Sequence, residues 1–441
     1  MNLLPMMMSP PSNASTKMGK VDRWIVNYMT CAAVIFGVAY IFNYLRGSSI
    51  GETGGSVLLA GILAFKALLV PGSRTVNGRG TVLLVLLFVL MMFNILISWD
   101  LMMSAGRWLM WLLIVVSFAR VTGASEGKWV QETIRRLPYM FIIIYLSIVS
   151  TFYFQTDGDS YAFARHLSGM YANLIVATGL FAATPRRKLL LVLFGLVGIY
   201  YSGAGGALFT IPIMFIPYIL YSTTSAPVKG FAVATMLLLG GVFFFETQLF
   251  SDFLDIKLNE QVDGGFAYNG LERLERSKDF RLALVQYGLN LTKQNPFGTG
   301  LGPTYQSDVG SIFGVAHVHD GTLSMLIELG IPGFALLASL LLWIFASIVR
   351  SPWIAHQTKA FYFTYFFTIF GRSLSENYTL FDLGNFFNLV FLLFTVSLFL
   401  NQAVRARAPQ PAPMRPPYPA HPQWGGPPRA AAPGQMIAGR R

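Results

Sequence analysis

Apolar runs, most of them long enough to cross a membrane, divide this chain of 441 residues from end to end. A transmembrane helix needs about 20 mostly apolar residues. Charged residues make up only 12% of the chain, about half the roughly 25% of a soluble domain. We therefore expect an all-α polytopic membrane protein with about 12 transmembrane helices. The runs lie approximately at 24–45, 56–71, 80–99, 102–119, 137–154, 170–184, 189–204, 206–221, 230–250, 322–349, 360–370 and 383–401.

Basic residues gather on alternate loops between these runs. Lys and Arg accumulate on the cytoplasmic side of membrane proteins. If the N-terminus is cytoplasmic, most of the 32 basic residues fall in inside segments, and the largest outside group falls in one long loop, 251–320. The pattern predicts an even number of helices with both termini cytoplasmic.

This topology divides the chain into five parts. They are a cytoplasmic N-terminal segment, 1–23; helices one to nine, 24–250; a long outside loop, 251–320; the last three helices, 321–401; and a Pro- and Arg-rich cytoplasmic tail, 402–441. Such a tail buries too little apolar surface to fold, so we expect it to be disordered.

Charge and cysteine content exclude two classes of function. The net charge of +12 is spread over many loops, whereas a nucleic-acid-binding protein gathers its basic residues on one face. The single cysteine, Cys31, lies in the first apolar run and offers neither an intramolecular disulfide nor a Cys-based metal site.

Arg281 is the first candidate for chemistry in the long loop. A guanidinium is the preferred bidentate ligand of phosphate, and Arg276 adds positive charge nearby. The structural alternative is that Arg281 pairs with Glu275 or Asp279. The stretch 271–291 has the spacing of a partly amphipathic helix, which we expect to end before Asn295-Pro296.

A glycine-rich turn follows that helix. It reads Pro296-Phe297-Gly298-Thr299-Gly300-Leu301-Gly302 and lacks the Lys-Ser/Thr ending of a nucleotide-binding loop. Two interpretations are open for Gly298, Gly300 and Gly302. In the first, their backbone contacts a sugar or phosphate. In the second, the glycines only allow the tight turns of the chain.

Two histidines precede the tenth apolar run, in the sequence His317-Val318-His319-Asp320. Imidazole has an unperturbed pKa near neutrality, which suits general-base work on a sugar hydroxyl. A structural role or half of a metal site is the alternative. The only other outside histidine is His166 and the carboxylates are scattered, so we expect no metal and no cofactor.

Two further arginines lie near membrane depth. Arg165 opens the helix that follows an outside loop, together with His166, Gly169 and Asn173, and Arg372 lies outside, between the last two helices. Charges at such depth are costly and tend to be functional or paired. Both arginines are candidates for substrate contact, although Arg372 could instead pair with Glu376.

These residues resemble the motif of the O-antigen ligase and polymerase family of bacterial inner-membrane glycan transferases. That motif is an Arg, a Pro fifteen residues on, Phe/Leu-Gly-x-Gly-x-Gly, and later His-Asn/Ser/Gln, nine residues, Gly, two residues, Gly. The first part is matched by Arg281, Pro296, Gly298, Gly300 and Gly302, and the second by His319, Gly330 and Gly333. Arg165-x-x-x-Gly169 with Asn173 resembles a weaker family pattern.

The chain departs from the family pattern at two positions. Asp320 stands where an amide or serine usually follows the histidine. Gly205 occupies the position at which many members carry an arginine. One phosphate-binding arginine is therefore missing or supplied from elsewhere, for instance by Arg165.

The resemblance implies a GT-C-like membrane glycosyltransferase that works without a metal on the periplasmic face. The donor would be an oligosaccharide on undecaprenyl pyrophosphate, and the acceptor a second glycan or lipid A-core. Arg281 and His319 would be catalytic, while Arg165, Arg276, Arg372, the three turn glycines, His317 and Asp320 would bind substrate. Membrane lipids and other polysaccharide export proteins would be further partners. We favour a repeat-unit polymerase of a surface polysaccharide or exopolysaccharide, with O-antigen ligase as the alternative.

A secondary transporter is the competing class. Many carriers have about twelve helices and cytoplasmic ends, but they carry their largest loop inside and show pseudo-symmetric halves. Here the largest loop lies outside after the ninth run, and no internal repeat is evident.

The predicted topology can be tested with reporter fusions. A fusion at Gly264 should report the periplasm and one at Pro413 the cytoplasm, because the basic loops fix the orientation. Paired alkaline phosphatase and fluorescent-protein reporters would make the measurement. A cytoplasmic signal from Gly264 would remove the basis for periplasmic catalysis.

Overall fold

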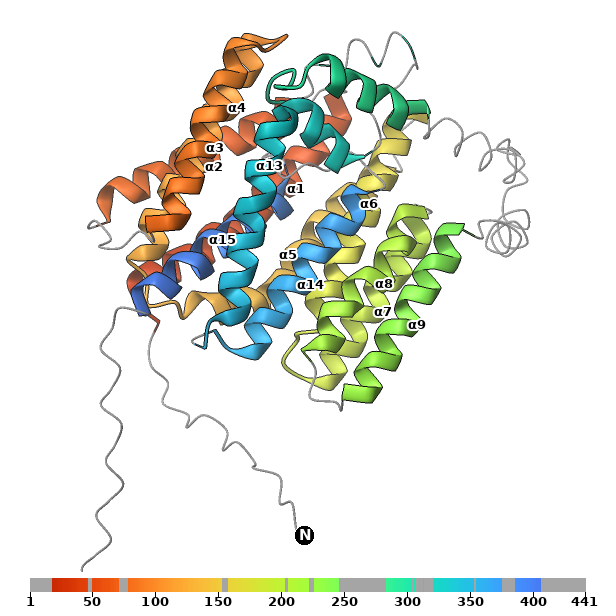
Figure 1. Ribbon diagram of the computed structural model, residues 1–441. Helices are drawn as coiled ribbons and strands as arrows, with labels where there is room; N and C mark the ends of the chain where they lie inside the picture. The colour runs from red at the N-terminus through yellow and green to blue at the C-terminus, as the bar shows by residue number, and fades with distance from the viewer. Residues whose placement is uncertain are drawn as a thin grey trace, which may run out of the picture.

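The computed structural model describes residues 18–46, 50–70, 78–152, 158–202, 205–221, 226–245, 283–302, 305, 309, 312, 320–352, 354–374 and 385–405. The regular structure in these ranges is entirely helical, which confirms the predicted all-α class. The helices pack side by side into a bundle (Figure 1). The segments 1–17 and 406–441, which hold nearly all of the predicted terminal segments, lie outside the described residues.

Each apolar run of the sequence overlaps a helix. The helices are α1 Lys20–Arg46, α2 Ile50–Leu69, α3 Gly78–Leu96, α4 Leu101–Gly123, α5 Trp129–Phe152, α6 Gly158–Gly179, α7 Pro185–Ser202, α8 Gly205–Leu220, α9 Ala226–Phe245, α13 Gly321–Arg350, α14 His356–Ser373 and α15 Phe386–Arg405. Residues 283–294 form a further helix, which ends before Asn295 as predicted.

Two helices begin well before the apolar run that predicted them. Helix α5 starts at Trp129 because the buried carboxylate of Asp22 accepts hydrogen bonds from the Glu126 and Trp129 N–H groups, at 3.1 and 3.2 Å. Such bonds satisfy the unpaired donors at a helix start. Helix α6 starts at Gly158, so Arg165 lies within the helix and not at its opening.

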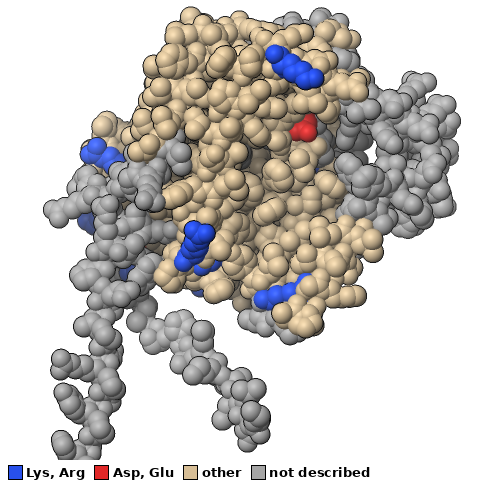
Figure 2. Space-filling view, in the orientation of Figure 1, with Lys and Arg blue, Asp and Glu red and all other residues tan. Residues whose placement is uncertain are grey.

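Several helices have the length and composition of membrane spans. Four described helices, α1, α4, α5 and α13, are long and apolar enough to cross a membrane. Large apolar side chains stay exposed on the bundle, for example Phe65 at 65% and Phe231 at 77%. The face in Figure 2 shows few charged side chains. The chain is a membrane protein, while twelve crossings and a periplasmic loop remain predictions.

An aromatic cluster holds the centre of the bundle together. The Phe141 ring of α5 lies 5.9 Å from Tyr171 of α6, 6.1 Å from Tyr365 of α14 and 5.7 Å from Phe386 of α15. The Tyr40 hydroxyl of α1 lies 3.2 Å from that of Tyr171. Aromatic pairs add about 0.5–1.5 kcal/mol each beyond the area they bury.

The bundle has two distinct ends. In Figure 1 the start of α1 and the end of α15 lie at one end, and the helix 283–294 lies at the other. The glycine-rich turn follows this helix directly, so it also belongs to the second end.

Candidate active site

A break in α13 creates the central feature of the site. Gly330 has φ 67° and ψ 178°, a conformation that only glycine adopts readily. Pro332 follows two residues later and has no N–H to donate to the carbonyl of Glu328, four residues before it. The break therefore leaves backbone groups of α13 without their usual helical partners.

The glycine-rich turn supplies those partners. The Thr299 N–H donates to the Ile327 carbonyl at 3.0 Å, and the Gly300 N–H donates to the Glu328 carbonyl at 3.3 Å. In return, the Ile331 N–H donates to the Pro296 carbonyl at 2.8 Å. Inside a membrane protein an unsatisfied backbone group costs several kcal/mol. The two halves of the sequence motif are thus joined by main-chain hydrogen bonds.

Each glycine of the turn occupies a position that a side chain would disrupt. Gly298, Gly300 and Gly302 have φ of 95°, 111° and 91°. A Cβ on Gly298 would lie 2.7 Å from the Gly330 nitrogen, and one on Gly330 would lie 2.5 Å from the Gly298 nitrogen. The two backbones meet glycine against glycine, so a methyl group on either side would force them apart.

A third segment, between α3 and α4, completes the arrangement. The Trp99 N–H donates to the Thr299 carbonyl at 3.0 Å, and the Ser104 hydroxyl donates to the Leu301 carbonyl at 3.1 Å. The Asn94 side chain donates to the Phe297 carbonyl. The turn is therefore bonded on one side to α13 and on the other to α3 and α4.

These contacts bear on the predicted role of the turn glycines. The Gly298 and Gly300 N–H groups donate to carbonyls, and the Gly302 N–H donates to the Glu328 carboxylate at 3.0 Å. All three amides are thus used within the protein. The geometry favours the tight-turn interpretation over backbone contact with phosphate or sugar.

Asp320 caps the first turn of α13. Its carboxylate accepts the Thr322 and Leu323 N–H groups at 2.8 and 2.9 Å. Burial raises the pKa of the Asp320 carboxyl, and these two bonds oppose the rise. Asn, Ser and Asp are all strong helix N-caps. Asp320 therefore forms the same helix cap that an Asn or a Ser at this position would form.

A hydrogen-bond chain connects this cap to the turn region. Buried Tyr305 donates to the Ser324 hydroxyl at 2.8 Å, which donates to the Asp320 carbonyl at 2.8 Å. Burial, followed by the charge of Glu328, raises the pKa of the Tyr305 phenol. Tyr305 thus remains a neutral hydrogen-bond donor that stabilises the start of α13. Asp320, at this start, directly follows His319 in the sequence.

Arg372 is fully buried at the end of α14. Its Nη2 donates to the His166 carbonyl of α6 at 3.0 Å. Charged groups at such positions are paired or functional, and this bond gives Arg372 at least a packing role. Its predicted pairing with Glu376 falls outside the described residues.

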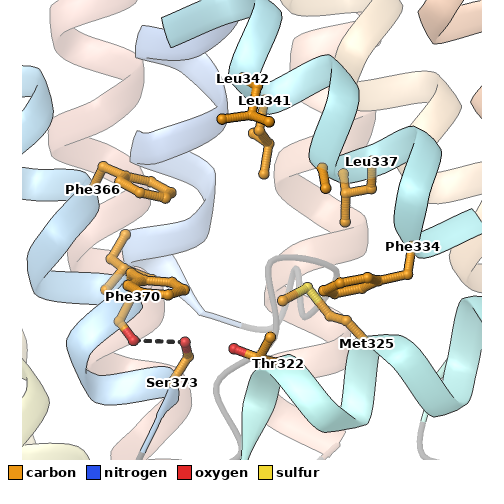
Figure 3. Close-up of a pocket in the computed structure, with 11 residues that line it drawn as sticks. Thr322, Met325, Phe334, Leu337, Leu341, Leu342, Phe366, Phe370 and Ser373 are labelled. Carbon is orange, nitrogen blue, oxygen red and sulfur yellow. Dashed lines mark hydrogen bonds between the residues drawn. The ribbon is translucent and has the colours of Figure 1, made fainter.

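A cavity of about 270 Å³ lies between α13 and α14. Its walls are apolar except at one end, where Figure 3 shows Thr322 and Ser373 together. Leu341 and Leu342 line the other end. Leu342 is 67% exposed, so the cavity reaches the apolar surface of the bundle. The polar end adjoins Asp320 through Thr322 and Arg372 through Ser373.

Several predicted site residues are not placed by the structure. Arg276, Arg281, His317 and His319 lie outside the described residues, and for Arg165 only the backbone, within α6, is described. No group of three His, Cys, Asp or Glu side chains suited to a metal occurs in the part of the chain described here.

Residues 190–338 match a family model described as O-antigen ligase. The matched segment runs from α7 to the middle of α13 and includes both the turn and the break. This segment, about a third of the chain, is similar to the O-antigen ligase family. No curated protein matches it. The matched model points to glycosyl transfer of the O-antigen ligase or polymerase type, with a glycan or lipid-linked substrate in general.

The site also includes residues that the sequence patterns did not single out. Ser104 and Arg107 come from α4, and Glu328 comes from α13. Arg107 and Glu328 each interrupt an apolar run, and an ionisable residue within a span is a functional candidate by default. That signal was available in the sequence. Ser104, in contrast, carries no pattern that marks it.

We expect Gly330→Ala to destabilise the protein strongly. The backbone conformation alone costs about 1–3 kcal/mol for a residue other than glycine, and the added methyl group meets the backbone of the turn. The midpoint of thermal unfolding in detergent, followed by fluorescence-detected size exclusion, measures the change. Gly61→Ala in α2 is the matched control, because its Cβ would meet nothing within 4 Å. Equal unfolding temperatures for Gly330→Ala and wild type would contradict the interlocked turn.

Proposed function

We propose that this protein transfers a glycan from undecaprenyl pyrophosphate to an acceptor sugar at the periplasmic face of the bacterial inner membrane. We favour repeat-unit polymerisation of a surface polysaccharide or exopolysaccharide. The family match supports glycosyl transfer. The observation that supports a lipid-linked donor is the cavity between α13 and α14.

The cavity has the properties that a polyprenyl chain requires. Its walls include Met325, Phe334, Leu337, Phe366 and Ile369, so it offers apolar contact along two helices. It is open to the lipid-facing surface at Leu342 and polar at the start of α13. An isoprenoid chain bound there would leave its pyrophosphate beside Asp320 and the neighbouring His319.

The chemistry follows from the charge that develops during transfer. The bond between the anomeric carbon and the pyrophosphate oxygen breaks while the acceptor hydroxyl oxygen bonds to that carbon. His319 takes the hydroxyl proton as general base. Arg281 stabilises the negative charge of the departing undecaprenyl pyrophosphate. The glycan is thereby transferred to the acceptor and undecaprenyl pyrophosphate is released, and no step requires a metal ion.

The acceptor distinguishes the two members of this reaction class. A polymerase uses the end of another lipid-linked repeat, and a ligase uses a sugar of lipid A-core. Proteoliposomes that contain the full chain and radiolabelled lipid-linked repeat as sole substrate test this directly. We expect a ladder of polymer on gels. Product formed only after lipid A-core is added would support the ligase, and the absence of any new covalent product would reject glycosyl transfer.

In that assay we expect His319→Ala to reduce polymer formation about 100- to 10,000-fold, the contribution of a positioned general base. His317→Ala is the comparison variant and should have a milder effect, because only His319 has the motif spacing to Gly330 and Gly333. Initial rates at equal membrane levels of the three proteins measure the difference. Full activity in His319→Ala would refute the assigned base, and loss on EDTA treatment with rescue by a divalent ion would favour a metal site.

The cavity predicts a separate effect on donor binding. Ala338→Phe would fill part of the space between α13 and α14. Each methylene of the lipid that loses its apolar contact costs about 0.8 kcal/mol, so loss of two raises the KM for the lipid-linked donor roughly tenfold. Ala335→Phe is the control, since Ala335 is exposed on the same helix and does not line the cavity. Equal KM values for the two variants would show that the cavity does not hold the donor.

A further inference from the structure

Arg107 stands out among the charged residues of the described structure. It lies in the second turn of α4, half-buried, at the end that carries the glycine-rich turn. It donates no hydrogen bond and forms no ion pair with any residue that the structure describes. Arg120, at the other end of α4, has a structural role, because it donates to the Val70 carbonyl at 3.2 and 3.3 Å.

The side chain of Arg107 lies across the last glycine of the turn. A Cβ on Gly302 would lie 2.8 Å from the Arg107 Nε and 2.9 Å from its Cδ. Gly302 has φ 91° and donates its N–H to Glu328. The absence of a side chain at residue 302 therefore leaves the space through which Arg107 passes.

Neither carboxylate described in this part of α13 forms an ion pair with Arg107. The Glu328 carboxylate accepts the Gly302 N–H, and Asp320 caps α13. Burial raises the pKa of the Tyr305 phenol, and the charge of Arg107 lowers that pKa by less. Arg107 is therefore close to Tyr305. The Arg107 side chain thus lies near the hydrogen bonds that connect Tyr305, through Ser324, to Asp320 at the start of α13.

We propose that Arg107 binds the phosphate groups of the lipid-linked donor and positions them at the start of α13. The assignment rests on the proposed function, since it names the part of that site that holds the anion. A guanidinium binds phosphate oxygens through two parallel N–H bonds.

Binding to the full chain in lipid nanodiscs tests this assignment. The probes are undecaprenyl pyrophosphate and undecaprenol, which share the chain but not the charge. We expect wild type to bind the pyrophosphate more tightly and Arg107→Gln to lose about tenfold or more of its affinity for this probe alone. Arg107→Lys should lose less, because it keeps the charge. Lys293→Gln, which removes an exposed charge from the helix 283–294, is the control and should bind both probes as wild type does.

Four outcomes would overturn the assignment. Unchanged pyrophosphate affinity in Arg107→Gln, or an equal loss for both probes, would reject Arg107 as the phosphate ligand and leave the proposed function intact. An equal loss would indicate a structural role. Failure of wild type to prefer the pyrophosphate would overturn both proposals. Displacement of the lipid by inorganic pyrophosphate at equal concentration would show that the site serves a free anion.

Discussion

The broken helix α13 is the constraint on which this end of the bundle depends. Pro332 removes a donor and Gly330 turns the backbone, so carbonyl groups are left without partners where water is scarce. The turn around Thr299 resolves this by exchanging main-chain hydrogen bonds with α13. That exchange requires glycine on both sides, and it also sets where α3 and α4 meet the turn.

The helices were predictable from the sequence because burial in a membrane requires long apolar runs. The break in α13 was not predicted, although Gly330 and Pro332 both signal it, because the surrounding residues are apolar enough to suggest one continuous helix. The early start of α5 was missed for another reason. It depends on Asp22, about 100 residues away in the sequence, and no local pattern reveals such a cap.

Motif spacing located the turn and Asp320, but not what these residues contact. The sequence left two interpretations of the turn glycines open, and the acceptors of their three N–H groups distinguish them, since Asn295 and Glu328 take all three. Arg107 was not singled out, although it interrupts an apolar run, because it lies on a helix far from the motif in sequence. A family pattern records the residues that keep a fixed spacing, whereas a site also includes residues brought to it from other helices.

The bond between Ser104 and Leu301 joins residues 197 positions apart. A ribosome that adds roughly 5–20 amino acids per second needs about 10–40 s to travel between them. During that interval the Leu301 and Thr299 carbonyls have not been made, so the Ser104 hydroxyl has only local partners such as Ser98 and the Trp99 N–H lacks its final acceptor. This end of α4 is therefore completed late in biogenesis, after the ribosome has made the glycine-rich turn.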